Sequence, residues 1–298
     1  MPTAAPVTTA TRSVNSAEAG SSGTAGDTTL QPMTGLLSGR KALITGASSG
    51  IGADLARGFS AAGATVGICG RRKDRLAEVL AECRAHTPES RMWVVDLSRL
   101  DEVAAFAHRA DDELGGIDVL VNNAGIPQRR NVRTLSIAEV DAVMAINFLS
   151  PVRLTLALLP RLLERGESHI VNVSSIAARL GPPREAAYSA SKAALTAFSE
   201  SMAIDLWGTG VHLHVVNPGI IDTELFHLPD NETSLADLEA LPPSEVTGAV
   251  IDAIGSGAFE IYVPPWFADI VAGKFQDPRA FLEGSAAWTA DRVAALGQ

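Results

Sequence analysis

The stretch that decides the fold is residues 41–52, KALITGASSGIG, where a short apolar run passes directly into a glycine-rich turn. Its glycines have the spacing Gly-x3-Gly-x-Gly. Glycines at the end of a strand let the backbone turn tightly and approach a pyrophosphate, whose charge is favoured by the N-terminus of the next helix. A glycine cluster alone is a weak signal, but this position predicts a dinucleotide site that includes Gly46, Ser48, Ser49, Gly50, Ile51 and Gly52.

Short Val/Ile/Leu-rich runs continue downstream of this stretch and alternate with helix-length segments. The runs lie at residues 42–45, 64–69, 92–95, 119–121, 170–173, 211–216 and 260–263, and the helical segments at 51–62, 72–85, 100–114, 151–165, 187–206 and 244–254. Apolar runs without alternation are typical of strands buried on both faces, and strand–helix alternation implies a parallel sheet with right-handed crossovers. We therefore predict the α/β class, as one doubly wound domain with a seven-stranded parallel sheet.

Composition divides the chain into three parts. Residues 1–36 are rich in Ala, Thr, Ser and Gly and cannot bury enough apolar area to offset their chain entropy, so we expect a disordered N-terminal tail. The tail has no apolar core of the kind a secretory signal needs. Residues 37–265 form the predicted domain. Residues 266–298 are rich in Trp and Phe, which predicts a C-terminal extension that packs on the domain or on a neighbouring subunit.

Charge and cysteine content limit the classes of function. The net charge of −10 gives no overall attraction to nucleic acid or to anionic lipid. The chain has only two cysteines, Cys69 and Cys83, which disfavours a disulfide framework or a zinc site and fits a reducing cytoplasm. His212 and His214 share one strand face, where packing is favoured over a metal. No uncharged apolar run reaches the roughly 18–20 residues of a membrane span, so we expect a cytoplasmic protein with a small-molecule substrate.

The end of the second apolar run indicates which dinucleotide binds. Many such folds place an acidic residue there for the ribose 2′-hydroxyl, whereas this chain reads Gly70-Arg71-Arg72. An acid would repel a 2′-phosphate, and arginine can hold it through bidentate, charge-assisted hydrogen bonds. The alternative is that Arg71 and Arg72 merely begin a solvated helix. We favour NADP(H) over NAD(H).

Four polar residues form the candidate catalytic set. Tyr188 and Lys192 are four residues apart in a helical segment, so both side chains project from one face. A nearby ammonium favours the phenolate and lowers its pKa, which suits Tyr188 for proton transfer with an alcohol or carbonyl oxygen. Ser175 ends a strand where ligands sit in open α/β sheets, although Ser174 could compete for the role. Asn147 interrupts an apolar helical stretch and needs a partner or a function.

The complete motif set resembles the short-chain dehydrogenase/reductase family over about residues 38–265. The motifs are Thr45-Gly-x3-Gly-Ile-Gly52, Asp96-Leu97, Asn122-Asn123-Ala124-Gly125, Asn147, Ser175, Tyr188-x3-Lys192, and Asn217-Pro218-Gly219 with Thr223. The resemblance implies a single Rossmann domain that binds NAD(P)(H) and a homodimer or homotetramer formed through the family's fifth and sixth helices.

The same resemblance implies a role for each matched residue. Tyr188 would be the acid/base, and Ser175 would stabilise the substrate oxygen. Lys192 would bind the nicotinamide ribose and lower the pKa of Tyr188, while Asn147 would hold a water in a proton relay. The implied cofactor contacts are Asp96 and Leu97 at the adenine, Asn123, Ala124 and Gly125 at the adenosine ribose, and Pro218, Gly219 and Thr223 at the nicotinamide end.

Substrate identity is less constrained than reaction class. The segment 224–243 resembles a substrate-covering lid, in which Phe226, Leu228 and Leu235 could line an apolar pocket or simply pack beneath it. Related enoyl reductases would need tyrosine at position 185, where this chain has Glu185, so double-bond reduction is disfavoured. We expect a ketone or aldehyde and alcohol pair, probed best by a substrate panel.

Two other functions stay open at this point. One is reduction of a 3-oxoacyl thioester, for which Arg129, Arg130 and Arg133 could meet an anionic carrier, although a solvated basic loop is favoured. The other is a non-catalytic NADP(H)-binding sensor, which is disfavoured because a sensor has no need of all four catalytic residues.

Overall fold

The computed structural model describes residues 35–227, 231–232, 234–236, 238–295 and 297. All of these belong to the unit Met33–Gln298. The predicted N-terminal tail therefore lies outside the described residues, apart from its last two positions, and so does Leu228 of the predicted lid.

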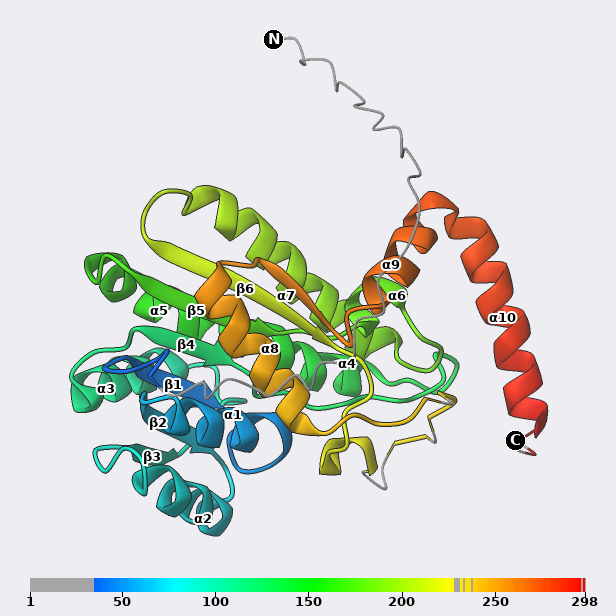
Figure 1. The fold of residues 1–298 in the computed structure, drawn as a ribbon. Helices are drawn as coiled ribbons and strands as arrows, with labels where there is room; N and C mark the ends of the chain where they lie inside the picture. The colour runs from blue at the N-terminus through cyan, green and yellow to red at the C-terminus, as the bar shows by residue number, and fades with distance from the viewer. Residues whose placement is uncertain (1–34, 228–230, 233, 237, 296, 298) are drawn as a thin grey trace, which may run out of the picture. The chain divides into compact units, whose positions relative to one another are not determined.

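The described residues form a seven-stranded, fully parallel sheet with the strand order β3-β2-β1-β4-β5-β6-β7 (Figure 1). The strand order reverses direction between β1 and β4, and both strands are fully buried along their shared register. This confirms the predicted doubly wound α/β fold. The strands are β1 (Lys41–Thr45), β2 (Thr65–Gly70), β3 (Arg91–Val94), β4 (Val119–Asn122), β5 (Ser168–Val173), β6 (Val211–Pro218) and β7 (Glu260–Val263).

Helices cover both faces of the sheet and create two apolar cores. Helices α1 (Gly50–Ala61), α2 (Lys73–Arg84) and α8 (Pro243–Ser256) pack over one face. Helices α3 (Val103–Leu114), α5 (Ser150–Glu164) and α7 (Ala186–Asp205) pack over the other. Successive side chains of a strand point to opposite faces, so β1 sends Ala42 and Ile44 into the first core and Leu43 into the second.

Several helical elements, most of them short, were not among the segments predicted from sequence. They are α4 (Ile137–Met144), the π-helix η1 (Ala145–Leu149), α6 (Ala177–Leu180), the 3-10 helix η2 (Glu224–His227), α9 (Phe267–Gln276) and α10 (Pro278–Ala295). Helix α4 begins at a capping box, in which Ser136 and Glu139 satisfy each other's backbone N–H groups. Such short helices carry too little apolar periodicity to stand out in a sequence.

The continuous helical stretch Ile137–Glu164 meets the length and composition of a membrane span. Its most apolar window has a mean hydropathy of 1.7, and 39% of that window is buried inside the fold. Core positions such as Leu154 and Leu158 supply that burial. A buried helix of a globular core passes the same test, so the apolar composition is weak evidence for a membrane.

The C-terminal extension consists of α9 and α10. Phe267 and Val271 of α9 are buried, which anchors this helix on the domain. Helix α10 buries none of its described residues, and Trp288 is 41% exposed. The predicted packing of the extension on the domain thus applies to α9, and α10 keeps most of its surface open.

Candidate active site

The glycine-rich turn between β1 and α1 is shaped by steric demand. Gly46 and Gly50 have φ angles of 69° and 54°, a region that glycine adopts at no cost. A Cβ atom on Gly46 would lie 2.7 Å from the Cα of Ala124, and one on Gly50 would lie 2.9 Å from the Cγ2 of Thr223. The glycines therefore bring the turn against the segments that follow β4 and β6, which contain other predicted cofactor contacts.

The N-terminus of α1 has open backbone donors. Ser49 is the N-cap residue, but its side chain makes no capping hydrogen bond. The first N–H groups of a helix have no partner within it and carry partial positive charge, which suits an anion such as a pyrophosphate. The turn thus has the shape and the donors that a dinucleotide requires.

The asparagine after β4 supports this turn from below. The side-chain Nδ2 of Asn123 donates to the carbonyl oxygen of Thr45 at 2.8 Å, while the Oγ1 of Thr45 accepts from the backbone N–H groups of Asn123 and Ala124 at 3.0 Å each. The Asn123 amide is therefore committed to the backbone of the glycine turn. Its predicted contact with the adenosine ribose stays a prediction.

The arginines after β2 are not simply a solvated helix start. Arg71 is exposed and helps to lower the pKa of Asp96, although hydrogen bonds from Ser98 contribute more to that shift. Arg72 donates to the hydroxyl of Ser48 at 3.1 and 3.0 Å and also to the hydroxyl of Ser49. The basic end of β2 and the glycine turn are thus joined into one surface.

The candidate catalytic pair lies on α7 beside the end of β5. Lys192 is buried, and its Nζ donates to the carbonyl oxygen of Val173 at 2.8 Å and lies 5.9 Å from the centroid of the Tyr188 ring. Tyr188 also interacts with the Ser175 hydroxyl through a side-chain hydrogen bond that lowers the tyrosine pKa. The fold therefore brings Ser175, Tyr188 and Lys192 together from two separate elements.

The pKa of Tyr188 moves against the sequence expectation. Desolvation by burial raises the pKa of Tyr188 to about 12, with a smaller upward contribution from Glu185, and Lys192 is not among the groups that lower it. Burial also lowers the pKa of Lys192 to about 8. In this arrangement the ammonium does not offset the effect of burial, because the Nζ is directed at the Val173 carbonyl and both groups lose hydration.

Asn147 occupies the π-helix η1, an irregularity that is frequent at functional sites. Its side chain is fully buried and exchanges hydrogen bonds with the backbone of Ile126 at 2.9 and 3.0 Å, and it donates to the Ser191 hydroxyl at 3.1 Å. A Cβ on Gly125 would lie 3.2 Å from the Oδ1 of Asn147 and 3.5 Å from the Nζ of Lys192. Gly125 is thus the residue that lets these two groups approach.

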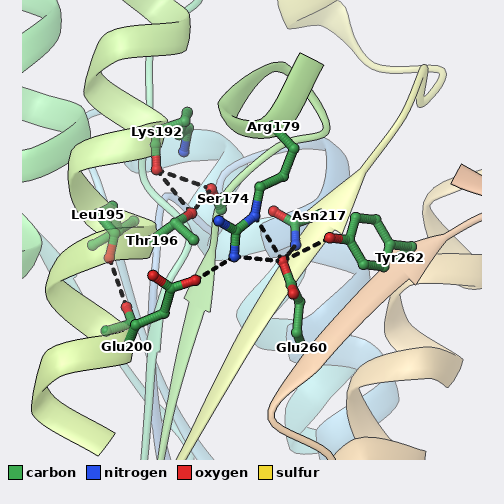
Figure 2. Close-up of polar contacts among 10 residues, drawn as sticks. Ser174, Arg179, Lys192, Leu195, Thr196, Glu200, Asn217, Glu260 and Tyr262 are labelled. Atoms are coloured by element: carbon green, nitrogen blue, oxygen red, sulfur yellow. Dashed lines mark hydrogen bonds and ion pairs between the residues drawn. The ribbon is translucent and has the colours of Figure 1, made fainter. Parts of the chain in front are cut away.

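A partly buried ion-pair network lies beside this site (Figure 2). Arg179, on the helix that follows Ser175, pairs with Glu200 of α7 at 2.5 Å and with Glu260 of β7 at 2.9 Å. The same Glu260 oxygen accepts from Asn217 at 2.9 Å and from the Tyr262 hydroxyl at 2.8 Å. Arg179 and the two carboxylates of Glu200 and Glu260 therefore connect α6, α7, the end of β6 and the start of β7.

Backbone hydrogen bonds hold the predicted Pro218–Gly219 segment in place. The carbonyl oxygen of Pro218 accepts from the backbone N–H of Ile176 at 2.9 Å, and the Gly219 N–H donates to Val263 at 2.8 Å. The ring of Phe267 packs so closely on Gly219 that a Cβ would collide with it. The segment therefore lies beside the Ser175 loop at the same edge of the sheet.

The basic loop after β4 is committed to protein contacts. Arg129 is buried and donates to the backbone carbonyls of Phe226 and Glu232 at 2.6 and 2.9 Å, with its guanidinium 4.9 Å from the Phe226 ring. Arg130 pairs with Glu139 at 3.1 Å. The predicted solvated loop is wrong for Arg129, because its charge is buried against the lid, and only Arg133 stays exposed as expected.

Comparison with known proteins assigns this arrangement to a family. Residues 40–232 match the family model of the short chain dehydrogenases. The chain is a short chain dehydrogenase. This family member is 35% identical over 228 residues to the ketoacyl reductase HetN of Nostoc sp., an alignment that covers 76% of this chain and 79% of that protein.

Solved structures of other short chain dehydrogenases have the same fold. A short chain dehydrogenase/reductase from Burkholderia phymatum in complex with NAD is 25% identical, with a TM-score of 0.74 over 82% of this chain and 95% of that one. A 3-ketoacyl-(acyl-carrier-protein) reductase from Brucella melitensis complexed with NADH is 28% identical, with a TM-score of 0.69 over 76% and 97%. The chain is thus an oxidoreductase of this family.

Several charged residues around the site of this short chain dehydrogenase were not predicted from the sequence. They are Arg75, Arg179, Glu200, Glu224 and Glu260, each of which makes an ion pair across a long interval of sequence. Charged residues on predicted surface segments give no local signal of such a partner. These ion pairs are recognised only when the folded structure brings the distant segments together.

Proposed function

We propose that this short chain dehydrogenase uses NADP(H) to interconvert a ketone or aldehyde and the corresponding alcohol. The observation that carries the proposal is the convergence of Ser175, Tyr188 and Lys192 beside Gly125, at the sheet edge that also holds the glycine turn. A proton-transfer group therefore lies next to a dinucleotide-shaped surface, as carbonyl reduction requires.

The residues of the glycine turn suit a nicotinamide dinucleotide. Bound NADP(H) would supply or accept the hydride. The open N-terminus of α1 and the glycine turn would hold its pyrophosphate, and Arg71 and Arg72 would hold a 2′-phosphate. Asp96 and Leu97 would lie at the adenine, and Pro218, Gly219 and Thr223 at the nicotinamide end.

The catalytic residues would divide the proton chemistry among them. Tyr188 would donate its hydroxyl proton to the carbonyl oxygen in reduction and take it back in oxidation, while Ser175 would hydrogen bond that oxygen. An ammonium has three N–H donors, so Lys192 can bind a ribose in addition to Val173. A ribose-bound, charged Lys192 would favour the Tyr188 phenolate, which burial alone disfavours. Asn147 would hold the relay water.

The substrate side favours a moderately bulky apolar compound. Within the predicted lid, Leu235 is buried and Phe226 is half-buried. Burial raises the pKa of the nearby Glu185 to about 7, which leaves a large fraction of this carboxyl neutral at neutral pH. A largely neutral Glu185 would favour an uncharged substrate beside Tyr188 over a cationic one.

Reduction of a 3-oxoacyl thioester is the second candidate. It is favoured by the similarity to the ketoacyl reductase HetN and to the 3-ketoacyl-(acyl-carrier-protein) reductase of Brucella melitensis. The buried, lid-bound Arg129 speaks against a basic loop that is free to meet an anionic carrier. A sensor function would leave the assembled Ser175, Tyr188 and Lys192 without a purpose.

We further propose that the enzyme is a cytoplasmic homodimer or homotetramer. Leu149, Leu156 and Leu163 repeat every seven residues along the helical stretch that includes α5, and each is at least 39% exposed. Trp207, which follows α7, is 88% exposed. Exposed apolar side chains in such numbers are typical of a subunit interface.

A substrate panel tests the proposed reaction. Purified protein is incubated with NADPH or NADH and a set of aliphatic ketones, aromatic ketones, aldehydes and 3-oxoacyl thioesters, and the absorbance of the reduced cofactor is followed. We expect turnover with NADPH on bulky apolar ketones to exceed that on the thioesters. Turnover only with thioesters would replace the first candidate by the second, and no turnover with either cofactor on any class would overturn both.

A further inference from the structure

Glu224 connects the predicted substrate lid to the basic end of β2. Its Oε2 pairs with the Nη1 of Arg72 at 2.7 Å, and its Oε1 pairs with the Nη1 of Arg75. Arg72 is the N-cap residue of α2 and Arg75 lies in its first turn, and both side chains reach the same carboxylate. Hydrogen bonds from the two arginines, first Arg75 and then Arg72, lower the pKa of Glu224. The carboxylate is therefore charged at neutral pH.

Arg72 makes this contact part of the cofactor surface. The guanidinium that holds Glu224 also donates to the hydroxyls of Ser48 and Ser49 in the glycine turn. The side chains of Arg72, Arg75 and Glu224 are 43%, 45% and 48% exposed, so a ligand can reach all three. A lid residue thus occupies guanidinium donors at the end of the surface that we propose for the adenosine 2′-phosphate.

We propose that Glu224 is a cofactor-specificity residue that competes with the 2′-phosphate of NADP(H) for Arg72 and Arg75. The inference rests on the proposed function, in that it requires a dinucleotide on the glycine turn. A phosphate carries about −1.5 to −2 charges and three acceptor oxygens, against one charge and two oxygens on a carboxylate. Two anions cannot share the same guanidinium donors without repulsion, so the phosphate displaces the carboxylate.

The competition has two consequences. Glu224 lowers the affinity for NADP(H) but not for NAD(H), which has no 2′-phosphate and leaves both ion pairs intact. Release of Glu224 also frees the lid at η2. NADP(H) therefore loosens the segment around Glu224 more than NAD(H) does. Cofactor choice and lid state are thereby linked.

The first test measures the binding of two nucleotide probes by titration calorimetry. Adenosine 2′,5′-bisphosphate carries the 2′-phosphate, and adenosine 5′-monophosphate lacks it. Glu224→Gln keeps the shape of the side chain and removes its charge. Because exposed ion pairs contribute modestly, we expect the bisphosphate to bind this variant about two- to five-fold more tightly, with the monophosphate unchanged.

Glu82→Gln is the matched control for this test. Glu82 lies on α2, as Arg75 does. Its side chain is 53% exposed, and it pairs with Arg57 at 2.6 Å. The substitution makes the same change in net charge without touching Arg72 or Arg75. We expect it to leave the preference between the two probes unchanged. An equal gain in bisphosphate affinity in both variants would reduce the effect to overall charge and overturn the competition.

Hydrogen–deuterium exchange gives a second readout on the intact chain. In the wild type, we expect residues 223–226 to exchange faster with bound NADPH than with bound NADH, and we expect Glu224→Gln to abolish the difference. Weaker or unchanged bisphosphate binding in Glu224→Gln would overturn the competition, since the carboxylate would then orient the arginines or play no part. Failure of the wild type to bind either probe would instead overturn the proposed dinucleotide site, and the competition with it.

Discussion

The two ends of the proposed site are held together by different forces. At the catalytic end, Asn147, Lys192 and Ser175 are buried and fixed by short hydrogen bonds to backbone atoms and hydroxyls. At the adenosine end, Arg72 and Glu224 are nearly half exposed and are held by ion pairs. The catalytic geometry is thus protected from solvent, and the nucleotide surface is open to salt and to competing anions.

This difference follows from what each end has to do. An unpaired polar group is costly inside a protein, so buried catalytic side chains stay in one geometry. Exposed ion pairs contribute little and exchange partners easily, which suits a surface that must release and accept a cofactor. Substitutions at the catalytic end should therefore change the rate, and changes at the adenosine end should alter the choice of nucleotide.

The largest effect is expected from Tyr188→Phe, which removes the reacting hydroxyl and keeps the ring. Positioned proton transfer contributes about 10²–10⁴-fold, so kcat should fall by that order while the Kd for NADPH barely changes. The measurement is steady-state kinetics on the best ketone of the panel, with binding by fluorescence titration. Tyr262→Phe, at the chain's other tyrosine, removes a hydroxyl that contacts only the supporting residue Glu260 and should lower kcat far less. A variant that retains more than about a tenth of wild-type turnover would exclude Tyr188 as the acid/base.

The next effect concerns the choice between cofactors. Arg71→Asp should make NADH bind more tightly than NADPH, because it replaces a charge-assisted phosphate contact worth about 1.5–3 kcal/mol by a repulsion. The Kd of each cofactor is measured by titration, with Arg109→Asp on α3 as a control of equal charge change. Equal wild-type affinity for NADPH and NADH would contradict the assignment of the 2′-phosphate to this end.

A pH effect on stability is expected from the histidines near the amino ends of β5 and β6, away from the proposed site. Burial and the neighbouring His214 and His212 lower the pKa of His169 to about 3, and the Nδ1 of His169 lies 3.0 Å from the Nε2 of His214. The folded state therefore binds fewer protons than the unfolded state between pH 6.5 and about 3, so stability falls as the pH falls through this window.

Urea unfolding at pH 7.5 and pH 5 checks this expectation. Each pKa unit corresponds to about 1.4 kcal/mol, so His169 alone contributes a loss of at most about 2 kcal/mol between pH 6.5 and 5. His169→Asn should reduce the loss, and a variant of the exposed His108 should not. Equal acid sensitivity in all three proteins would assign the effect to the carboxylates.

Added salt should weaken NADPH binding by a few-fold at most and should affect kcat less. Raising NaCl from about 50 to 500 mM shortens the Debye length and screens the exposed arginines. We expect the Kd for NADPH to rise several-fold and kcat at saturating cofactor to change less than twofold. A comparable fall in saturated kcat would show that the catalytic end is as exposed to ions as the adenosine end.

The smallest effect is expected from removal of residues 1–36. Leu37 is buried, and its N–H donates to Ala62 at 3.2 Å, so the deletion has to stop before this residue. Because the deleted segment has no periodic apolar pattern, the melting temperature and the Kd for NADPH should stay almost unchanged. A loss of several degrees in a thermal scan would show that the segment packs on the domain.

Local sequence patterns were enough to predict the fold and to select the residues of the candidate site. Apolar runs and their spacing report burial on both faces of a sheet, so all seven strands were predicted close to their observed bounds. The four-residue spacing of Tyr188 and Lys192 is likewise a local property of a helix. Short irregular elements such as η1 and α6 were missed because their conformation depends on packing.

Which charged groups meet depends on how distant segments pack together. Glu224 and Arg72 are 152 positions apart, and Arg129 reaches the Glu232 carbonyl across 103 positions. The direction of the Tyr188 pKa shift also depends on burial, which the spacing of Tyr188 and Lys192 along the chain does not report. Periodicity and motif spacing are set along the chain, whereas ion pairing and desolvation arise when distant segments pack together.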